Sequence, residues 1–267
     1  MDPRPTSIRA HGQSGQAIVE AAFMLPMMIF FLLCTLQLTL LQQARIMVEY
    51  AAFNAARTGV VHNMNNGTDG GDPTTGATMR NAAVYSILPT YGRTDSMGAI
   101  TTTLAQYEAT DVAMHAQGLP MVKVAVLNPH TADFTTFGSQ LNKQEIDFDD
   151  MRPTAASATL LSIQVRYLYE LRVPFANWMI QSIWFAAQVG VLGLWTGPNM
   201  LTPTLGTANG ATALGPPATV GTLNDGMPGG LNVAALAARP GGKFYMPVNA
   251  WYSMRMQSNP YLKWAAP

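Results

Sequence analysis

An uncharged apolar run from Ala21 to Leu41 is the feature that most constrains how this chain can fold. The hydrocarbon core of a bilayer is about 30 Å thick, and a helix needs roughly 20 apolar residues to cross it. The run has that length and contains no Asp, Glu, Lys or Arg. It therefore predicts a membrane-spanning helix.

Glu20 stands directly before this run. A charged side chain costs about 2.5–3.5 kcal/mol at the centre of a bilayer and less near its surface, and charged residues in such positions usually serve a function. Glu20 is thus a candidate functional residue. The plain alternative is that its side chain extends to the lipid headgroups.

Charge and composition exclude several classes of protein. Only 11% of the 267 residues are charged, and 15 Lys and Arg balance 15 Asp and Glu. A chain without net positive charge lacks the basic surface that binding of nucleic acid requires. The single cysteine, Cys34, excludes an intramolecular disulfide and is expected to fill space as a small apolar residue.

The apolar run is not expected to be a secretory signal peptide. It is longer than the roughly 7–15 residues of a typical h-region, and no small-residue cleavage site follows it. Arg4 and Arg9 precede the run. We therefore expect a retained segment in the inner membrane, with a cytoplasmic N-terminus and a periplasmic head.

One long helix is predicted from about Gln16 to Thr58, with Gly59 as its C-cap. Pro26 is expected to kink it, because proline removes one backbone hydrogen bond. The second half is amphipathic, with apolar residues at helical spacing. At 1.5 Å per residue the helix is about 60 Å long, so its outer half must contact something other than lipid.

The rest of the chain predicts an α+β head. Short helices are expected over residues 79–88, before Pro89, and 100–115. A strand is expected over 121–127, and a longer one over 158–173 alternates apolar and polar residues, as in a sheet with one wet face. Residues 243–258 return to strand-like sequence and could pair antiparallel with it.

Residues 175–195 form a second apolar segment, with Trp178, Trp184 and Trp195 as candidate interface residues. Three interpretations remain open: a helix buried against the sheet, a helix at the membrane surface or against a partner subunit, and a second span. The segment 197–242 that follows is rich in Gly, Pro, Thr and Ala and predicts a long, flexible arm.

No catalytic arrangement is recognisable. The four histidines lack metal-ligand spacing, and neither a P-loop nor a nucleophile elbow is present. Two acidic stretches, 69–72 and 145–150, contain oxygen ligands suited to Ca²⁺ but lack EF-hand spacing. The sequence predicts a protein that is not an enzyme and carries no cofactor or metal.

Residues Gly15 to Pro26 and the helix end from Ala51 to Val61 resemble TadE-like proteins. These are minor pseudopilins of the tight-adherence (Flp-type) branch of type IV pilus systems. The last strand-like segment, Ala250 to Ser258, also resembles theirs. The resemblance implies a prepilin-type leader that a membrane aspartic peptidase cuts between Gly15 and Gln16. Glu20 could then pair with the new α-amino group of Gln16 on a neighbouring subunit.

Together these patterns predict a hydrophobic helix (16–60, spanning about 21–41) and an α+β head (61–267), and the resemblance implies a leader over 1–15. The resemblance implies a structural pseudopilin of a pilus used in cell adhesion: a minor or tip-proximal subunit, or an assembly initiator. Expected partners are other pilins, the prepilin peptidase, the inner-membrane assembly platform and membrane lipid. The alternative is a permanently anchored periplasmic accessory protein that never enters the fibre.

Overall fold

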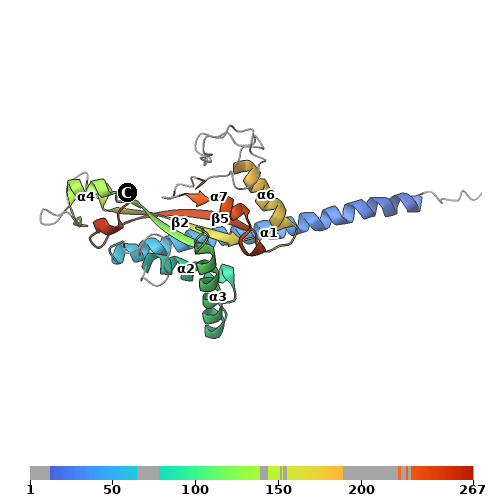
Figure 1. The fold of residues 1–267 in the computed structure, drawn as a ribbon, viewed down its shortest axis with the longest axis horizontal. Helices are drawn as coiled ribbons and strands as arrows, with labels where there is room; N and C mark the ends of the chain where they lie inside the picture. Colours follow the sequence, from blue (N-terminus) through green and yellow to red (C-terminus); the bar gives the residue numbers. More distant parts are fainter. Residues whose placement is uncertain are drawn as a thin grey trace, which may run out of the picture.

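The computed structural model describes residues 13–64, 78–138, 144–150, 152, 155–188, 222–223, 227 and 230–266. One long N-terminal helix packs with half its length against a small antiparallel sheet, and its other half projects from this head (Figure 1). Short helices surround the sheet. The predicted α+β class is confirmed.

Helix α1 (Gln13–Val61) continues through Pro26 and includes the whole predicted apolar run. Small apolar residues recur three and four positions apart along its second half, and all of them are buried: Ala44, Val48, Ala51, Ala52, Ala55, Ala56 and Val60. Such spacing places them on one side of a helix. Their small size lets the backbone of α1 lie close to its neighbours.

Gly59 lies inside the last turn of α1 and is not the predicted C-cap. A Cβ at this position would lie 2.8 Å from Leu161 Cδ2 and 2.9 Å from Met79 Sδ. The close approach of these two side chains to α1 therefore favours glycine here. The chain leaves the helix through Asn63 and Met64, which have φ angles of 55° and 60°.

Helices α2 (Thr78–Tyr91) and α3 (Met97–His115) follow. The sequence places the end of α2 at residue 88, before Pro89, whereas the helix runs three residues further, because proline deletes one backbone hydrogen bond without ending a helix at once. The N-cap of α3 is Ser96, whose hydroxyl accepts a hydrogen bond from the Ala99 amide.

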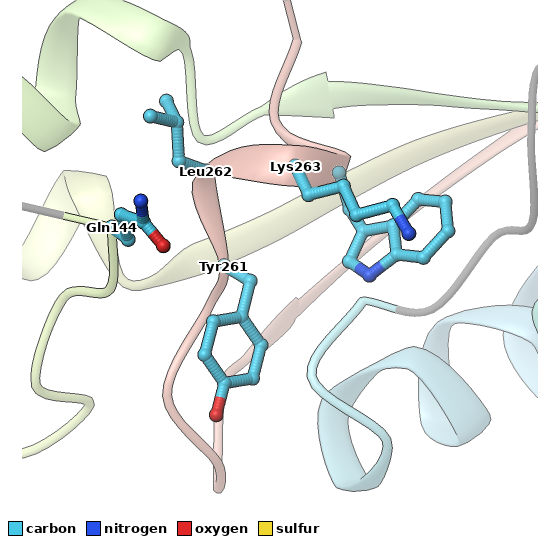
Figure 2. Close-up of a pocket in the computed structure, with 5 residues that line it drawn as sticks. Gln144, Tyr261, Leu262 and Lys263 are labelled. Atoms are coloured by element: carbon cyan, nitrogen blue, oxygen red, sulfur yellow. The ribbon is translucent and has the colours of Figure 1, made fainter.

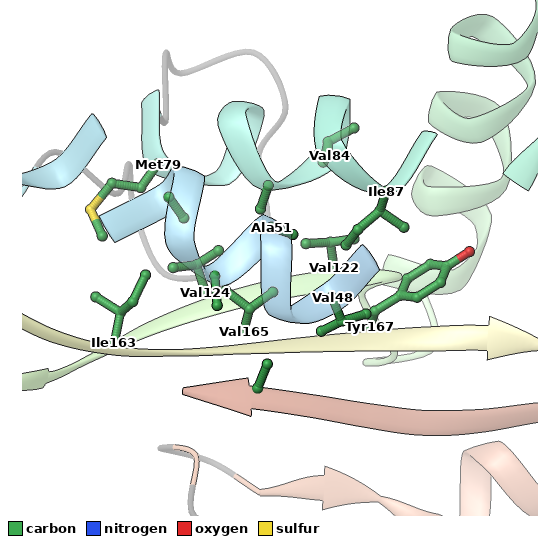
Figure 3. Close-up of a cluster of buried hydrophobic side chains, with 14 of the residues drawn as sticks. Val48, Ala51, Met79, Val84, Ile87, Val122, Val124, Ile163, Val165 and Tyr167 are labelled. Atoms are coloured by element: carbon green, nitrogen blue, oxygen red, sulfur yellow. The ribbon is translucent and has the colours of Figure 1, made fainter. Parts of the chain in front are cut away.

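The main sheet has three antiparallel strands in the order β1 (Val122–Asn128), β2 (Leu160–Glu170) and β5 (Tyr245–Arg255). The predicted antiparallel pairing of the two long strands is confirmed, with Val165 opposite Ala250. Helices α1 and α2 cover one face of this sheet (Figure 3). Their shared core joins Val48 of α1, Ile87 of α2 and Tyr167 of β2.

The opposite face of the sheet is also covered, contrary to the predicted wet face. Gln164, Arg166 and Leu168 of β2 point to that side and are buried. Arg166 Nη1 donates a hydrogen bond of 2.9 Å to the carbonyl oxygen of Gly230. A remote segment thus supplies the partner that lets this long polar side chain be buried.

That segment belongs to the predicted flexible arm. Strands β3 (Thr222–Leu223) and β4 (Leu231–Asn232) form a small second sheet, and helix α7 (Val233–Ala237) follows β4. Leu231, Val233 and Leu236 join the hydrophobic core. Residues 230–242 are therefore part of the head, because these apolar side chains interrupt the Gly- and Pro-rich sequence. Residues 197–221 lie outside the described residues.

Further short elements complete the head. Helix α6 (Ala176–Gln188) lies beside α1 where α1 leaves the head (Figure 1). The others are α4 (Thr131–Phe137), α5 (Ala155–Ala158) and two 3-10 helices (Pro240–Gly242 and Leu262–Trp264).

A buried ion pair joins three of these elements. Arg80 of α2 donates to Asp111 of α3 at 2.5 Å, and both side chains are almost fully buried. The other carboxylate oxygen of Asp111 accepts a 2.8 Å hydrogen bond from the Met121 amide, directly before β1. Asp111 therefore holds α3 against both α2 and the sheet.

Candidate functional site

The projecting half of α1 exposes large apolar side chains on all sides. Between Ile18 and Leu36 they include Phe23, Met27 and Phe31, each more than 70% exposed. Among the described residues, α1 is the one helix long and apolar enough to cross a membrane. So large an exposed apolar surface is unfavourable in water and marks contact with a membrane or a partner. It is consistent with a membrane anchor.

The predicted processing residues lie at the start of this helix. Gly15 is exposed in the first turn of α1, and an added Cβ would meet nothing within 4 Å. Gln16 follows it in the same turn. The backbone here is helical, whereas a peptidase needs an extended segment, so cleavage would require the first turn to unwind. Terminal turns fray at low cost, and glycine weakens a helix further.

Glu20 lies five residues after Gly15, about 7.5 Å further along the helix axis. Its side chain is exposed, and within the described part of the chain no ion pair includes it. The structure therefore brings Gly15, Gln16 and Glu20 onto one short stretch of helix. Their proposed roles remain predictions, as does a kink at Pro26.

Gln37 is a functional position that the sequence analysis missed. Its side chain is fully buried although it lies within the predicted span. Gln37 Oε1 accepts a 2.8 Å hydrogen bond from the Val173 amide, in the turn between β2 and α6. The sequence feature that could have revealed Gln37 is an amide side chain inside an apolar run. Gln37 is the first fully buried side chain along the described part of α1, and the wholly exposed stretch before it ends at Leu32.

The three tryptophans predicted as interface residues differ in position. Trp178 is 56% exposed on the outer side of α6. Trp184 is half-buried against the core, with its ring edge-on to Phe185 at 5.1 Å between centroids. Trp195 lies outside the described residues. The structure therefore leaves Trp178 as the candidate for contact with another molecule.

The described residues contain no group of three or more His, Cys, Asp or Glu side chains placed to hold a metal ion. Of the two acidic stretches, 69–72 lies outside the described residues. In the other, Asp150 forms an ion pair with Arg152, and Asp147 accepts a hydrogen bond from Asn259 Nδ2. The Arg152 guanidinium lowers the pKa of Asp150.

A surface pocket of about 440 Å³ lies beside the 3-10 helix Leu262–Trp264 (Figure 2). Gln144, Tyr261, Leu262, Lys263 and Trp264 line it. Lys263 Nζ lies 4.6 Å from the centre of the Trp264 ring. None of these described lining residues is an acid, a histidine or a thiol.

The helix that carries Gly15, Glu20 and Gln37 is also the segment that known proteins share. Residues 15–57 match the TadE-like protein family. The TadE-like segment begins at the predicted processing glycine and ends within the last turns of α1. No curated protein and no solved structure matches the chain.

The TadE-like match indicates a pilin-like protein associated with Tad pili. Proteins of this kind are structural components and associate with other pilus proteins. The match covers α1 and leaves out the sheet and its covering helices. The TadE-like character therefore concerns the anchor, and the head must be interpreted from its own structure.

Proposed function

We propose that this chain is a structural pseudopilin of a Tad or type IV-like pilus, anchored and polymerised through α1. In this role it is a minor or tip-proximal subunit, or an initiator of assembly. One observation carries the proposal: a TadE-like helix projects from the head with its apolar side chains uncovered and a carboxylate, Glu20, near its start. Such a helix can lie in lipid first and in a helical bundle later.

In the proposed mechanism the prepilin peptidase cuts between Gly15 and Gln16. The cut removes residues 1–15 and creates a positively charged α-amino group on Gln16. Glu20 of an adjacent subunit then accepts a hydrogen bond from this amine, which neutralises a carboxylate inside an apolar bundle. The pairing sets the axial offset between adjacent helices. The inner-membrane assembly platform would extract the subunit from lipid as it joins the fibre.

A second candidate is a permanently anchored periplasmic accessory protein of the same apparatus. The helical conformation around Gly15 favours it, because a peptidase does not cut a folded helix. In both cases the N-terminus is cytoplasmic and the head periplasmic, and in the first the head becomes extracellular upon assembly.

The decisive experiment is mass spectrometry of the chain purified from its native membrane. A mature chain that begins at Gln16 supports the pseudopilin, and an intact leader supports the static anchor. Gly15→Val should block cleavage without disturbing the fold, since nothing lies near the new side chain. Gly98→Val is the control, because Gly98 is equally open but lies on α3.

Assembly is tested with Glu20→Ala, which should be processed normally yet be absent from sheared fibres. Glu49→Ala is the matched control, since Glu49 is also an exposed carboxylate on α1 but lies beside the head. Fibres that contain Glu20→Ala at the normal level would rule out the pairing of Glu20 with the Gln16 amine.

A further inference from the structure

We propose that the outer side of α6, together with Phe175 before it, lies against the lipid bilayer beside α1. The head then rests on the membrane surface through a second contact in addition to its anchor. This inference depends on the membrane anchoring of α1 and goes beyond it, because it assigns a lipid-binding surface to the head.

The distribution of side chains on α6 is the first argument. Gln181 points inward, is 3% exposed and donates a 3.0 Å hydrogen bond to the Tyr245 carbonyl. Trp178 and Ile183 point outward and are 56% and 50% exposed. A helix that faces water buries its apolar side and exposes its polar side. Here an amide, Gln181, is inside, and two large apolar residues, Trp178 and Ile183, are outside, although Ile180, Trp184 and Phe185 pack inward against the core.

The position of α6 along α1 is the second argument. The turn before α6 binds α1 through the Val173 amide and Gln37, and α6 itself contacts α1. From Ile18 to Leu36, the stretch before this contact, α1 extends about 28 Å at 1.5 Å per residue. A bilayer core is about 30 Å thick. If that stretch spans the core, Gln37 and the start of α6 lie at its outer surface.

Residue types and backbone at the start of α6 form the third argument. No charged residue occurs from Pro174 to Gln188. Tryptophan prefers the boundary between hydrocarbon and headgroups. Phe175 has a φ of 64°, which a bulky residue rarely adopts, and its ring is 74% exposed. The chain thus accepts an unfavourable backbone conformation and leaves an aromatic ring outside the head.

Lipid is the occupant we assign, because this surface is continuous with the exposed apolar surface of α1. Leu33 and Cys34, one turn before Gln37, are already half-buried. The outer side of α6 therefore begins where the lipid-facing side of α1 ends. A neighbouring subunit on the same surface is the competing outcome of the test below.

The test uses the full chain in nanodiscs of phosphatidylcholine and phosphatidylglycerol that carry bromine on the acyl carbons near the headgroup. One variant keeps Trp178 and has phenylalanine at the other four tryptophans. The control variant keeps only Trp251, which is 60% exposed on β5 and lies six residues, about 20 Å, beyond Tyr245 along the strand. Circular dichroism checks that both variants fold as the parent does.

Bromine should quench more than half of the Trp178 emission and leave Trp251 almost unchanged. A spin label at Ile183→Cys, in a Cys34→Ala chain, should be more accessible to oxygen than to a water-soluble nickel complex. Equal, weak quenching of both tryptophans in an embedded chain overturns the lipid contact alone. Shielding of Trp178 from both bromine and iodide indicates a partner subunit and overturns it as well. A chain that does not insert overturns the anchoring too.

Discussion

Gln37 and Val173 are joined by a hydrogen bond of 2.8 Å in which the side-chain oxygen of Gln37 accepts from the backbone N–H of Val173. The contact lies at the boundary between the free half of α1 and the half that belongs to the head. It involves the first fully buried side chain along the described part of α1.

Gln37→Leu should destabilise the head. The substitution removes the acceptor of the part-buried Val173 N–H, and a hydrogen bond of this kind contributes about 0.5–1.5 kcal/mol. Denaturant unfolding of the detergent-solubilised chain measures the loss. Gln42→Leu is the control, because Gln42 is exposed on the same helix. Equal stability of the two variants would contradict the role given to Gln37.

Arg80→Ala should be far more damaging than Arg93→Ala. Arg80 and Asp111 are buried, so removing one partner leaves a buried unpaired charge at a cost of about 3–5 kcal/mol. Arg93 and Asp95 form a similar pair that is exposed, and water screens such pairs. Thermal unfolding of both variants tests the difference. A small effect of Arg80→Ala would show that the pair is dispensable.

The head should lose stability at alkaline pH. Burial, and next the Asp111 carboxylate, raise the pKa of Tyr107 well above its ordinary value. Burial also raises the pKa of Tyr167 and Tyr245. The unfolded chain releases these protons near pH 10 while the folded chain keeps them. Stability is therefore full below about pH 10 and falls as the pH rises above it.

The variant Tyr107→Phe isolates the contribution of Tyr107 to the loss of stability at alkaline pH. Within the described part of the chain, the buried Tyr107 hydroxyl has no hydrogen-bond partner, so its removal should leave stability at pH 7 unchanged or higher. The loss of stability between pH 7 and alkaline pH should be smaller in Tyr107→Phe than in the parent chain. Tyr85→Phe, at an exposed position on α2, should change neither. Urea unfolding between pH 7 and about pH 11 measures both effects, and an unaltered alkaline slope in Tyr107→Phe would contradict the assignment.

Gly59→Ala should destabilise the head by about 1–3 kcal/mol, because the new methyl group overlaps Leu161 and Met79. Gly98→Ala serves as the control, since a Cβ there meets nothing within 4 Å. Alanine favours a helix by up to about 1 kcal/mol over glycine, so this control should be neutral or stabilising. The melting temperature of Gly59→Ala should therefore fall, and that of Gly98→Ala should stay the same or rise.

Local patterns predicted much of this fold. The uncharged run and the amphipathic pattern after it indicate one long helix, and alternation at Ile163, Val165 and Tyr167 indicates β2. The proposed processing and assembly residues, Gly15, Gln16 and Glu20, also lie close together in sequence. Patterns among residues that lie close together in sequence can be recognised without knowledge of the tertiary structure.

Other features depend on distant partners. Arg166 looks like a solvent-facing residue until Gly230 supplies its acceptor. Gln181 looks like the polar edge of a surface helix, but the Tyr245 carbonyl draws it inward and turns Trp178 outward. The role of Gly59 follows from Leu161 and Met79, far away in sequence. Periodicity cannot reveal which face of a segment finds such partners.

The shared helix α1 has a mechanical consequence. Between Pro26 and its first core contacts the helix has no break, and the same rod continues beneath the sheet to Val61. A screw motion imposed on the membrane half is thus transmitted to the head as a rotation about the same axis, without an intervening hinge. A label on β5 would therefore report the angle through which the projecting half of α1 has rotated.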